Sequence, residues 1–319
     1  MLYPIGIQSF EDIRRGGYVY VDKTALIYKL AATGKYYFLS RPRRFGKSLL
    51  ISTMEAYFKG RKELFDGLAI ASLEKDWTEY PVLHLDLGGA NYADMDALKE
   101  KLGRQLNDLE SEYGVVRKYK TLPVRFETII EAAYRKTGRQ VVILVDEYDK
   151  PVIDNLDRPE LQDKMRETLR GFYGVMKSKD AFIRFGFLTG VTKIGKMSVF
   201  SDLNNPQDIS MDKEYPDICG ISESDLKVYF TESVKELAEA NDLTEEECYR
   251  FFDDLCTFSE IEAMSQRFEV ASLLADGKTF TQISQKIGVS STTITRVNKC
   301  LCYGADGYKL LLERAKEEK

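Results

Sequence analysis

The sequence predicts an α/β domain, with a mostly parallel sheet and flanking helices, followed by a small all-α domain. Over roughly the first 230 residues, short apolar runs alternate with stretches of helical periodicity, whereas no convincing strand follows Asn241. Such alternation is typical of helices layered on a parallel sheet. The length of 319 residues suits two domains, at about 100–200 residues for each.

Four runs of apolar and aromatic residues, each bounded by turn residues, are the predicted strands. They cover residues 36–39, 82–87, 141–145 and 182–188. Between them, the spacing of apolar residues predicts helices over 47–58, 95–113, 124–136 and 160–177. A stretch rich in Ser, Asn, Asp and Pro (198–216) and a short helical pattern (222–230) then close this domain.

The last part of the chain shows helical patterns in succession, at residues 244–256, 259–275, 279–287 and 291–302, with one more after Asp306. We therefore expect an α/β domain over residues 1–230, a linker over 231–243 and a helical domain over 244–319.

The composition is that of an ordinary globular protein, with 44% hydrophobic and 30% charged residues, which excludes collagenous and wholly disordered classes. The net charge of −5 and a sequence pI of about 5.3 argue against attraction of nucleic acid by overall basic charge. Any such binding must be local. Residues 278–309 carry five cations against one anion, so one part of the acidic helical domain is basic.

The chain lacks a secretion signal and the run of about 18 apolar residues that a membrane-spanning helix needs, so we expect a cytoplasmic protein without membrane contact. Five cysteines, all in the last third and without CxxC spacing, are expected to be free thiols rather than a zinc site. His84, the only histidine, is expected to be a core residue rather than a base.

The segment YYFLSRPRRFGKSLL reads as strand, turn and helix, and its turn ends in the Gly-Lys-Ser of a Walker A P-loop. Arg41 stands where the first glycine of that motif is usual. In such a turn, Lys47 reaches the outer phosphates, Ser48 ligates Mg²⁺ and Gly46 allows close backbone approach. We expect nucleotide contacts from the residues of this turn, which are Arg41, Arg43, Arg44, Phe45, Gly46, Lys47, Ser48 and Leu49. A basic surface turn is the alternative.

A second motif, VVILVDE, has the form of a Walker B strand and follows about 100 residues later. Asp146 is expected to hold Mg²⁺ through water, and Glu147 to orient or deprotonate the attacking water. Parallel α/β sheets bind ligands at the carboxyl ends of their strands. The two motifs together therefore predict a nucleotide site, where Asp86 could also approach.

Thr189 follows the predicted strand 182–188, where ATPases place a sensor of the γ-phosphate; an ordinary strand-end turn is the alternative. Lys193, Arg166 and Arg170 could supply charge to the transition state. Solvated helix faces carry such residues routinely, so these three remain weaker candidates.

Several segments together resemble the bacterial AAA-ATPase-like family over about residues 2–230. They are YPIGIQSFEDIRRGGYVYVDKT, FLSRPRRFGKSLLISTMEAYF, VVILVDEYDKP, FLTGVTKI and LNNPQDIS. The resemblance implies a P-loop NTPase fold of AAA-like type, ATP and Mg²⁺ as cofactors, and ATP hydrolysis. It makes Arg41 a family trait, and it places Asp22 and Lys23 near the nucleotide without giving their roles.

Members of that family typically continue into a nuclease domain of the PD-(D/E)xK type, from which this sequence departs. The residues that match this motif by letter are Pro216-Asp217 and Asp225-Leu226-Lys227, and they fall in a predicted turn and helix rather than on paired strands. We therefore do not expect nuclease activity.

Residues 279–301 follow the pattern of a helix-turn-helix. Ile283 and Ile287 are spaced for one helix face, Gly288 permits the turn, and Ser290 or Ser291 can cap the second helix. Ile294, Val297 and Leu301 then face inward. The outward face presents Ser291, Thr292, Thr295, Arg296 and Lys299, side chains that suit base edges and phosphates of double-stranded DNA. A helical hairpin used only for packing is the alternative.

The segment from Glu245 to Tyr308 resembles the YerC/YecD-like branch of the tryptophan repressor superfamily. The resemblance implies a helical DNA-binding module that forms intertwined dimers and reads bases at about Ser291, Thr292 and Thr295. Nothing in the sequence shows a site for a tryptophan corepressor.

The leading hypothesis is an ATPase coupled to sequence-specific DNA binding, in a homodimeric or larger transcription regulator. The alternative is an ATPase of defence or signalling type whose helical domain serves oligomerisation only. A third possibility is a fusion of two modules without coupling.

Overall fold

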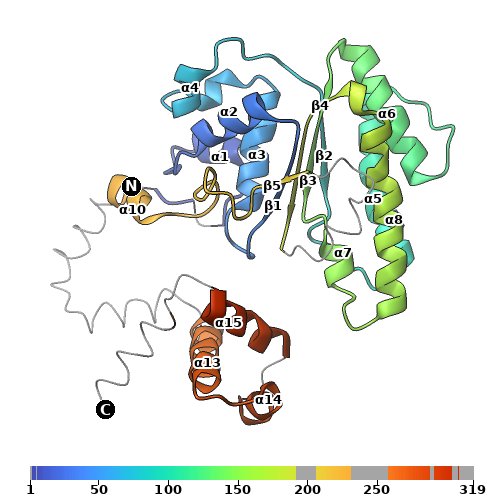
Figure 1. The fold of residues 1–319 in the computed structure, drawn as a ribbon. Coiled ribbons are helices and arrows are strands. Elements are labelled where there is room, and N and C mark those ends of the chain that lie inside the picture. Colours follow the sequence, from blue (N-terminus) through green and yellow to red (C-terminus); the bar gives the residue numbers. More distant parts are fainter. Residues whose placement is uncertain are drawn as a thin grey trace. The chain divides into compact units, whose positions relative to one another are not determined.

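The computed structural model describes residues 2–4, 6–191, 206–230, 258–287, 291–303 and 308 (Figure 1). The chain divides into two compact units, Met1–Thr231 and Glu232–Lys319. The predicted helix 244–256, the linker 231–243, Lys193, Gly288 and Ser290 lie outside the described residues.

The first unit is built on a five-stranded parallel sheet of order β2-β3-β4-β1-β5. Its strands are β1 (Tyr36–Ser40), β2 (Val82–Asp86), β3 (Val141–Asp146), β4 (Ile183–Gly190) and β5 (Gln207–Asp208). The predicted α/β class is confirmed, and so are the four strands expected from apolar runs. The two-residue strand β5 was not predicted, because its polar residues pair with the sheet edge through the backbone alone.

Long helices follow the strands as the apolar spacing predicts: α3 (Lys47–Phe58), α5 (Met95–Tyr113), α6 (Leu122–Thr137) and α8 (Pro159–Ser178). The short pattern after Pro216 forms α10 (Glu223–Tyr229). Six shorter elements were not predicted: α1 (Phe10–Arg15), α2 (Thr24–Thr33), η1 (Lys62–Phe65), α4 (Ala69–Leu73), α7 (Lys150–Ile153) and η2 (Asp180–Phe182). Elements of one to three turns contain too few repeats to establish a helical period.

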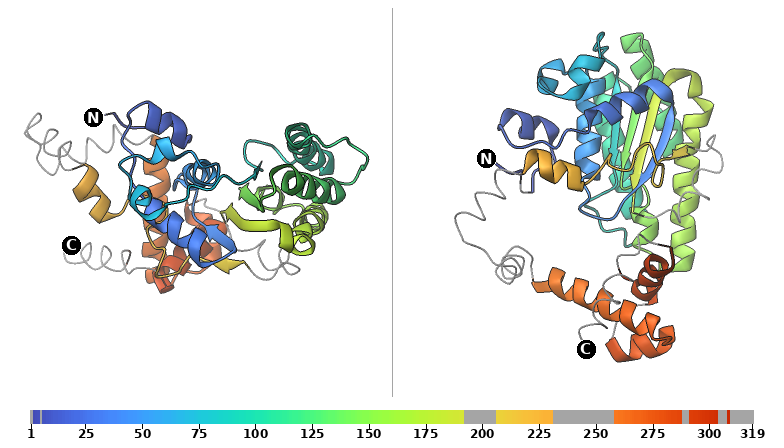
Figure 2. Two further views of the ribbon diagram at one scale, coloured as in Figure 1. Left: turned by 90° about the horizontal axis from the view of Figure 1, so that it is seen from above. Right: turned by 60° about the vertical axis from the view of Figure 1, so that its left-hand side comes forward.

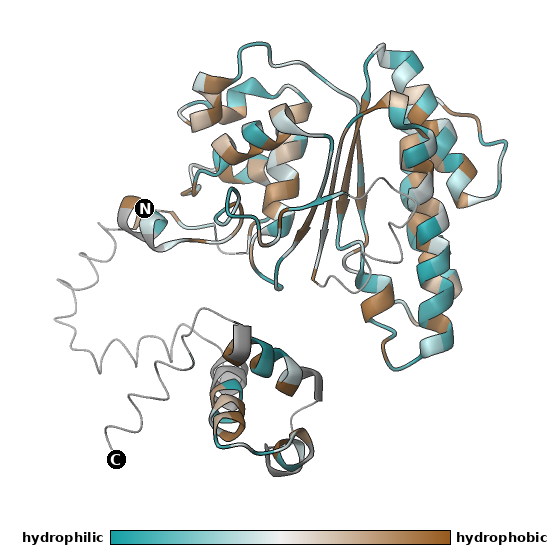
Figure 3. Ribbon diagram, in the orientation of Figure 1, coloured by the Kyte–Doolittle hydropathy of each residue, from teal (hydrophilic) through white to brown (hydrophobic). Residues whose placement is uncertain are grey.

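Helices cover both faces of the sheet, with α1 to α4 on one face and α5, α6 and α8 on the other (Figures 1 and 2). Strand β3 lies inside the sheet and every one of its residues is buried. Its side chains alternate between the layers, since Ile143 joins the cluster with α5, α6 and α8 while Leu144 joins the other. Because helices cover both faces of the sheet, both faces of β3 are apolar and its sequence is a continuous apolar run. The strands of the sheet are coloured brown, for hydrophobic residues, in Figure 3.

The helical unit contains α13 (Phe258–Ala275), α14 (Phe280–Ile287) and α15 (Ser291–Tyr303). Ile283, Ile294 and Val297, expected to face inward, are buried in its small core, and Leu301 packs against it. The side chain of Ile287 is not among those described. The expected helical module is confirmed.

His84 joins β2 to α3 as part of the packing. Its Nδ1 lies 2.8 Å from Oε2 of Glu55. The other carboxylate oxygen of Glu55, Oε1, accepts a hydrogen bond from Lys59 at 2.7 Å. Burial alone would raise the pKa of Glu55, but the hydrogen bonds from His84 and Lys59 outweigh it and lower the pKa to about 2. The ionised carboxylate therefore stabilises the fold.

Replacing Glu55 by Gln is expected to lower the free energy of unfolding at pH 7 by about 2–3 kcal/mol. The folded-state pKa is depressed, so this contribution is complete above the ordinary value of 4.5 and disappears as the pH falls toward about 2. Denaturant unfolding at pH 7 and pH 3, followed by the fluorescence of the single tryptophan in the first unit, Trp77, measures the effect. The difference between wild type and E55Q should shrink at pH 3; a constant difference would contradict the ionic origin. Glu79→Gln, at an exposed position, is the control.

Candidate nucleotide site

The turn between β1 and α3 contains two residues with left-handed backbone, Arg44 at φ 67° and Gly46 at φ 79°. Gly46 immediately precedes the first residue of α3, Lys47. A helix begins with amide groups that have no partner inside the helix, and its dipole favours negative charge there. The turn therefore presents an anion-binding geometry at the carboxyl edge of the sheet.

Lys47 is buried inside this turn. Its Nζ donates hydrogen bonds to the carbonyl oxygens of Arg41 at 3.0 Å and Pro42 at 2.9 Å. Burial lowers the pKa of Lys47, while the carboxylates of Asp146 and Glu147 act in the opposite direction. The ammonium group is thus held inside the turn by acceptors that an arriving phosphate could replace.

Asp146 ends β3 as a buried carboxylate beside Thr189 of β4. The Thr189 hydroxyl donates a hydrogen bond to Oδ1 of Asp146, and the Glu147 amide donates to the same oxygen at 3.1 Å. The Glu147 amide also lies 3.3 Å from the Thr189 hydroxyl oxygen. Thr189 is fully buried. These contacts make Thr189 a positioning residue for Asp146, whereas its predicted sensing of a phosphate stays a prediction.

Glu147 has a left-handed backbone, at φ 52°, which is a strained conformation for a residue with a side chain. Its carboxylate packs against Gly88, where a Cβ atom would lie 3.1 Å from Oε2 of Glu147 and 2.9 Å from Oδ1 of Asp86. Asp86 and Glu147 therefore face the same glycine. Lys101 donates a hydrogen bond to the Gly88 carbonyl oxygen at 2.9 Å and supports this wall. Sequence reasoning missed Gly88 and Lys101.

Asp149 is a further buried carboxylate that was not predicted. Its two oxygens accept hydrogen bonds from the Val191 amide at 3.2 and 3.0 Å. A Cβ atom at Gly190 would lie 2.6 Å from the Tyr148 ring and 2.8 Å from the Asp149 carboxylate. The Asp-Glu-Tyr-Asp run thus fastens the end of β3 to the end of β4, and only glycine fits at position 190. The sequence signal for Asp149 was its place as the second aspartate of this run.

Arg41 is engaged away from the turn that it begins. Its guanidinium donates to the carbonyl oxygen of Ser210 and to that of Pro216 at 3.2 Å. Arg43, Arg44 and Phe45 are exposed. Among the weaker candidates, Arg166 bonds to Asp163 and Gln162 of its own helix, and Arg170 is exposed on that helix.

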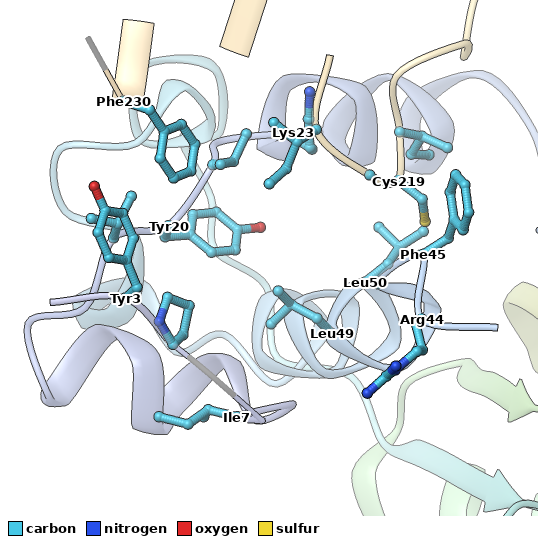
Figure 4. Close-up of a pocket in the computed structure, with 17 residues that line it drawn as sticks. Tyr3, Ile7, Tyr20, Lys23, Arg44, Phe45, Leu49, Leu50, Cys219 and Phe230 are labelled. Atoms are coloured by element: carbon cyan, nitrogen blue, oxygen red, sulfur yellow. The ribbon is translucent and has the colours of Figure 1, made fainter. Parts of the chain in front are cut away.

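An apolar pocket of about 450 Å³ adjoins the turn (Figure 4). The N-terminal segment, the start of α3 and the segment that leads into α10 form it, with Val21, Phe45, Leu49, Ile218 and Phe230 among its lining residues. The rings of Tyr3 and Phe230 stack at a centroid distance of 5.5 Å. This size and this lining are typical of small-molecule pockets, and Gly46 is shared between the pocket and the phosphate turn.

A family described as Predicted AAA-ATPase has a sequence model that matches residues 4–200. The chain belongs to this AAA-ATPase family. A second family model, that of the Trp repressor protein, matches residues 230–316. The resemblances stated from the sequence are thereby confirmed for both parts.

Two relatives are uncharacterized proteins. This chain is 39% identical over 300 residues to an uncharacterized protein in the vnfD 5′ region of Azotobacter chroococcum mcd 1, and the match covers 89% of this chain and 58% of that one. The chain therefore spans little more than half the length of this relative. It is 54% identical over 72 residues to the uncharacterized protein YerC of Bacillus subtilis (strain 168), covering 23% of this chain and 69% of YerC.

Among solved structures, a TrpR-like protein from Eubacterium eligens ATCC 27750 is 42% identical, over 28% of this chain and 95% of that chain, with a TM-score of 0.23.

The helical unit of this ATPase family member presents a polar face on α15. Thr295, Arg296 and Lys299 are exposed, while Ile294 and Val297 of the same helix are buried. The side chains of Ser291 and Thr292 are not among those described. The outward positions expected for DNA contact are thus exposed wherever the structure describes their side chains.

In the described part of the chain, no group of three His, Cys, Asp or Glu side chains is arranged to hold a metal ion. No helix there is long and apolar enough to span a membrane. Ser48 and Asp146 remain the predicted ligands of Mg²⁺, a cation that takes oxygen donors and is commonly bound by one or two protein groups together with phosphates.

Replacing Thr189 by Val is expected to lower the free energy of unfolding of the first unit by about 1–3 kcal/mol, because the change removes the hydroxyl hydrogen bond that the buried Asp146 carboxylate accepts. Trp77 packs against Tyr57 and Phe65, so its fluorescence during urea unfolding reports on this unit. Thr189→Ser keeps the hydroxyl and should lose less stability. A T189V variant as stable as the wild type would refute the positioning role.

Proposed function

We propose that this protein binds and hydrolyses ATP and couples this activity to sequence-specific DNA binding in transcription regulation. The observation that carries the first half is the placement of Lys47, buried inside a P-loop turn at the start of α3. The apolar pocket that shares Gly46 supports it, because a purine base needs such a surface next to its phosphates.

In the proposed mechanism, the amide groups at the start of α3 and the ammonium of Lys47 bind the phosphates. Ser48 and Asp146 would hold Mg²⁺, which when bound neutralises charge on the phosphate oxygens. Glu147 orients the attacking water and accepts its proton. Thr189 keeps Asp146 in position, and the wall of Asp86 and Gly88 keeps the Glu147 carboxylate in place.

The pocket offers room for the base of the nucleotide. Phe45 and Leu49 come from the phosphate turn and the first turn of α3, so a base in this pocket stays within reach of the phosphate-binding amides. Burial of a flat aromatic base against apolar side chains contributes binding free energy through the hydrophobic effect. The exposed Arg43 and Arg44 add positive charge near the phosphates.

For DNA, α15 is proposed as the recognition helix, with Thr295, Arg296 and Lys299 on its exposed face and Ser291 and Thr292 in its first turn. Ser290, which the sequence also predicts to contact DNA, lies outside the described residues. The Trp repressor match over residues 230–316 supports this assignment. Two copies of such a helix in a homodimer or larger oligomer would contact the two halves of a double-stranded operator.

Lys47→Ala should abolish binding of a fluorescent ATP analogue, since the phosphates lose their buried cation. Glu147→Gln should leave binding intact and slow ATP hydrolysis by about a hundredfold or more, within the range of general base catalysis. Phosphate release and analogue titration on the full chain measure both effects. Lys75→Ala, at an exposed position after α4, is the charge-matched control. Unchanged turnover in E147Q would exclude Glu147 as the base.

Arg296→Ala should weaken binding to a duplex selected from a random pool by at least about tenfold, the value of one specific base contact. Filter retention at low salt measures it. Arg267→Ala removes an equal charge from an exposed position on α13 and should have little effect. Failure of the wild type to retain any duplex would instead favour an ATPase whose helical unit serves oligomerisation only.

A further inference from the structure

Asp22 and Lys23 connect the apolar pocket to α10, the last described helix of the first unit. Lys23 lines the pocket, and its Nζ forms an ion pair with the carboxylate of Asp225 on α10. Both side chains are largely buried, with exposed fractions of 11% and 13%. The ion pair therefore joins a residue of the pocket wall, Lys23, which is labelled in Figure 4, to α10.

Asp22 holds its side of this contact rigid. One carboxylate oxygen accepts hydrogen bonds from the amide and the hydroxyl of Thr24, at 2.8 and 2.6 Å, and the other accepts from the Ala69 amide at 2.7 Å. The Asp22 amide donates to the hydroxyl of Tyr229 on α10 at 3.1 Å. Asp22 thus fixes the starts of α2 and α4 and adds a second contact to α10.

Asp225 is held on its own side by Ser222, whose amide and hydroxyl each donate to its carboxylate at 2.7 Å. Burial would raise the pKa of Asp225, but the hydrogen bonds from Lys23 and Ser222 outweigh it and lower the pKa. Asp225 is therefore ionised. A buried charge that loses its ionic partner is strongly destabilised, and without Lys23 the Asp225 carboxylate would keep only the hydrogen bonds from Ser222.

The segment that carries Asp225 also forms the pocket and leads out of the unit. Ile218, Cys219, Gly220, Ile221 and Phe230 line the pocket. The first unit ends at Thr231, so α10 is its last described helix before the boundary between the units.

We propose that the Lys23–Asp225 ion pair is a latch through which an occupied nucleotide pocket releases α10. This rests on the proposed ATP binding. A nucleotide in the pocket brings ribose oxygens and phosphate charge to the ammonium of Lys23, and these compete with Asp225. Once Lys23 turns to the nucleotide, the Asp225 carboxylate must move to water, and α10 moves with it.

The test is hydrogen–deuterium exchange of the amides of residues 222–230 in the full chain, with and without the non-hydrolysable analogue AMP-PNP and Mg²⁺. In the wild type, AMP-PNP should raise exchange by about tenfold, a change that corresponds to about 1.4 kcal/mol. Asp225→Asn should raise exchange to that level without nucleotide, and AMP-PNP should then add little.

Two further variants separate the latch from a general loss of structure. Val228→Ala changes an exposed residue of the same helix and should leave both the basal exchange and the response intact. The exchanged pair, Lys23→Asp with Asp225→Lys, should restore slow exchange without nucleotide.

The outcomes distinguish the two proposals. If a fluorescent ATP analogue does not bind the wild type at all, the proposed nucleotide binding fails. If it binds, but AMP-PNP leaves exchange at residues 222–230 unchanged, or D225N exchanges as slowly as the wild type, the latch is wrong.

Discussion

The burial of Asp146 is the constraint on which the candidate site depends. A carboxylate at the end of a buried strand is stable only if hydrogen bonds or cations compensate its lost hydration. Here the register of β3 and β4 brings Thr189 beside it, and the left-handed turn at Glu147 directs an amide to the same oxygen. Lys47 adds positive charge from the neighbouring strand–helix turn. The same contacts that stabilise the fold therefore bring together the groups that the proposed hydrolysis needs.

Much of the fold and part of the site could be predicted from local sequence. The turn with Lys47 and the strand that ends in Asp146 and Glu147 each contain their own chemical signal, and the long helices repeat their apolar spacing over several turns. Gly88 and Gly190 could not be found in this way. Their contacts form only where the ends of β2, β3 and β4 lie side by side in the folded sheet. These strand ends are far apart in the sequence, so no short segment shows the contacts.

The partner of Lys23 is the same kind of case. Asp225 lies 202 residues further along the chain, in a segment whose letters echo a nuclease motif, and only the folded structure shows it as half of an ion pair. In the helical unit, by contrast, local sequence was enough to predict the core. The small core of Ile283, Ile294 and Val297 follows from periodicity alone, and the overall net charge of −5 concealed the local excess of cations around α15.

The contacts of Arg41 tie the loop between β1 and α3 to residues about 170 positions further along the chain. The arginine that replaces the first glycine of the loop is anchored on carbonyl oxygens at Ser210 and Pro216, and the amide of Ser40 donates to the Ser210 hydroxyl. The family match ends at residue 200. A fragment cut at that boundary would keep every motif residue of the loop and lose the contacts of Ser40 and Arg41 with Ser210 and Pro216.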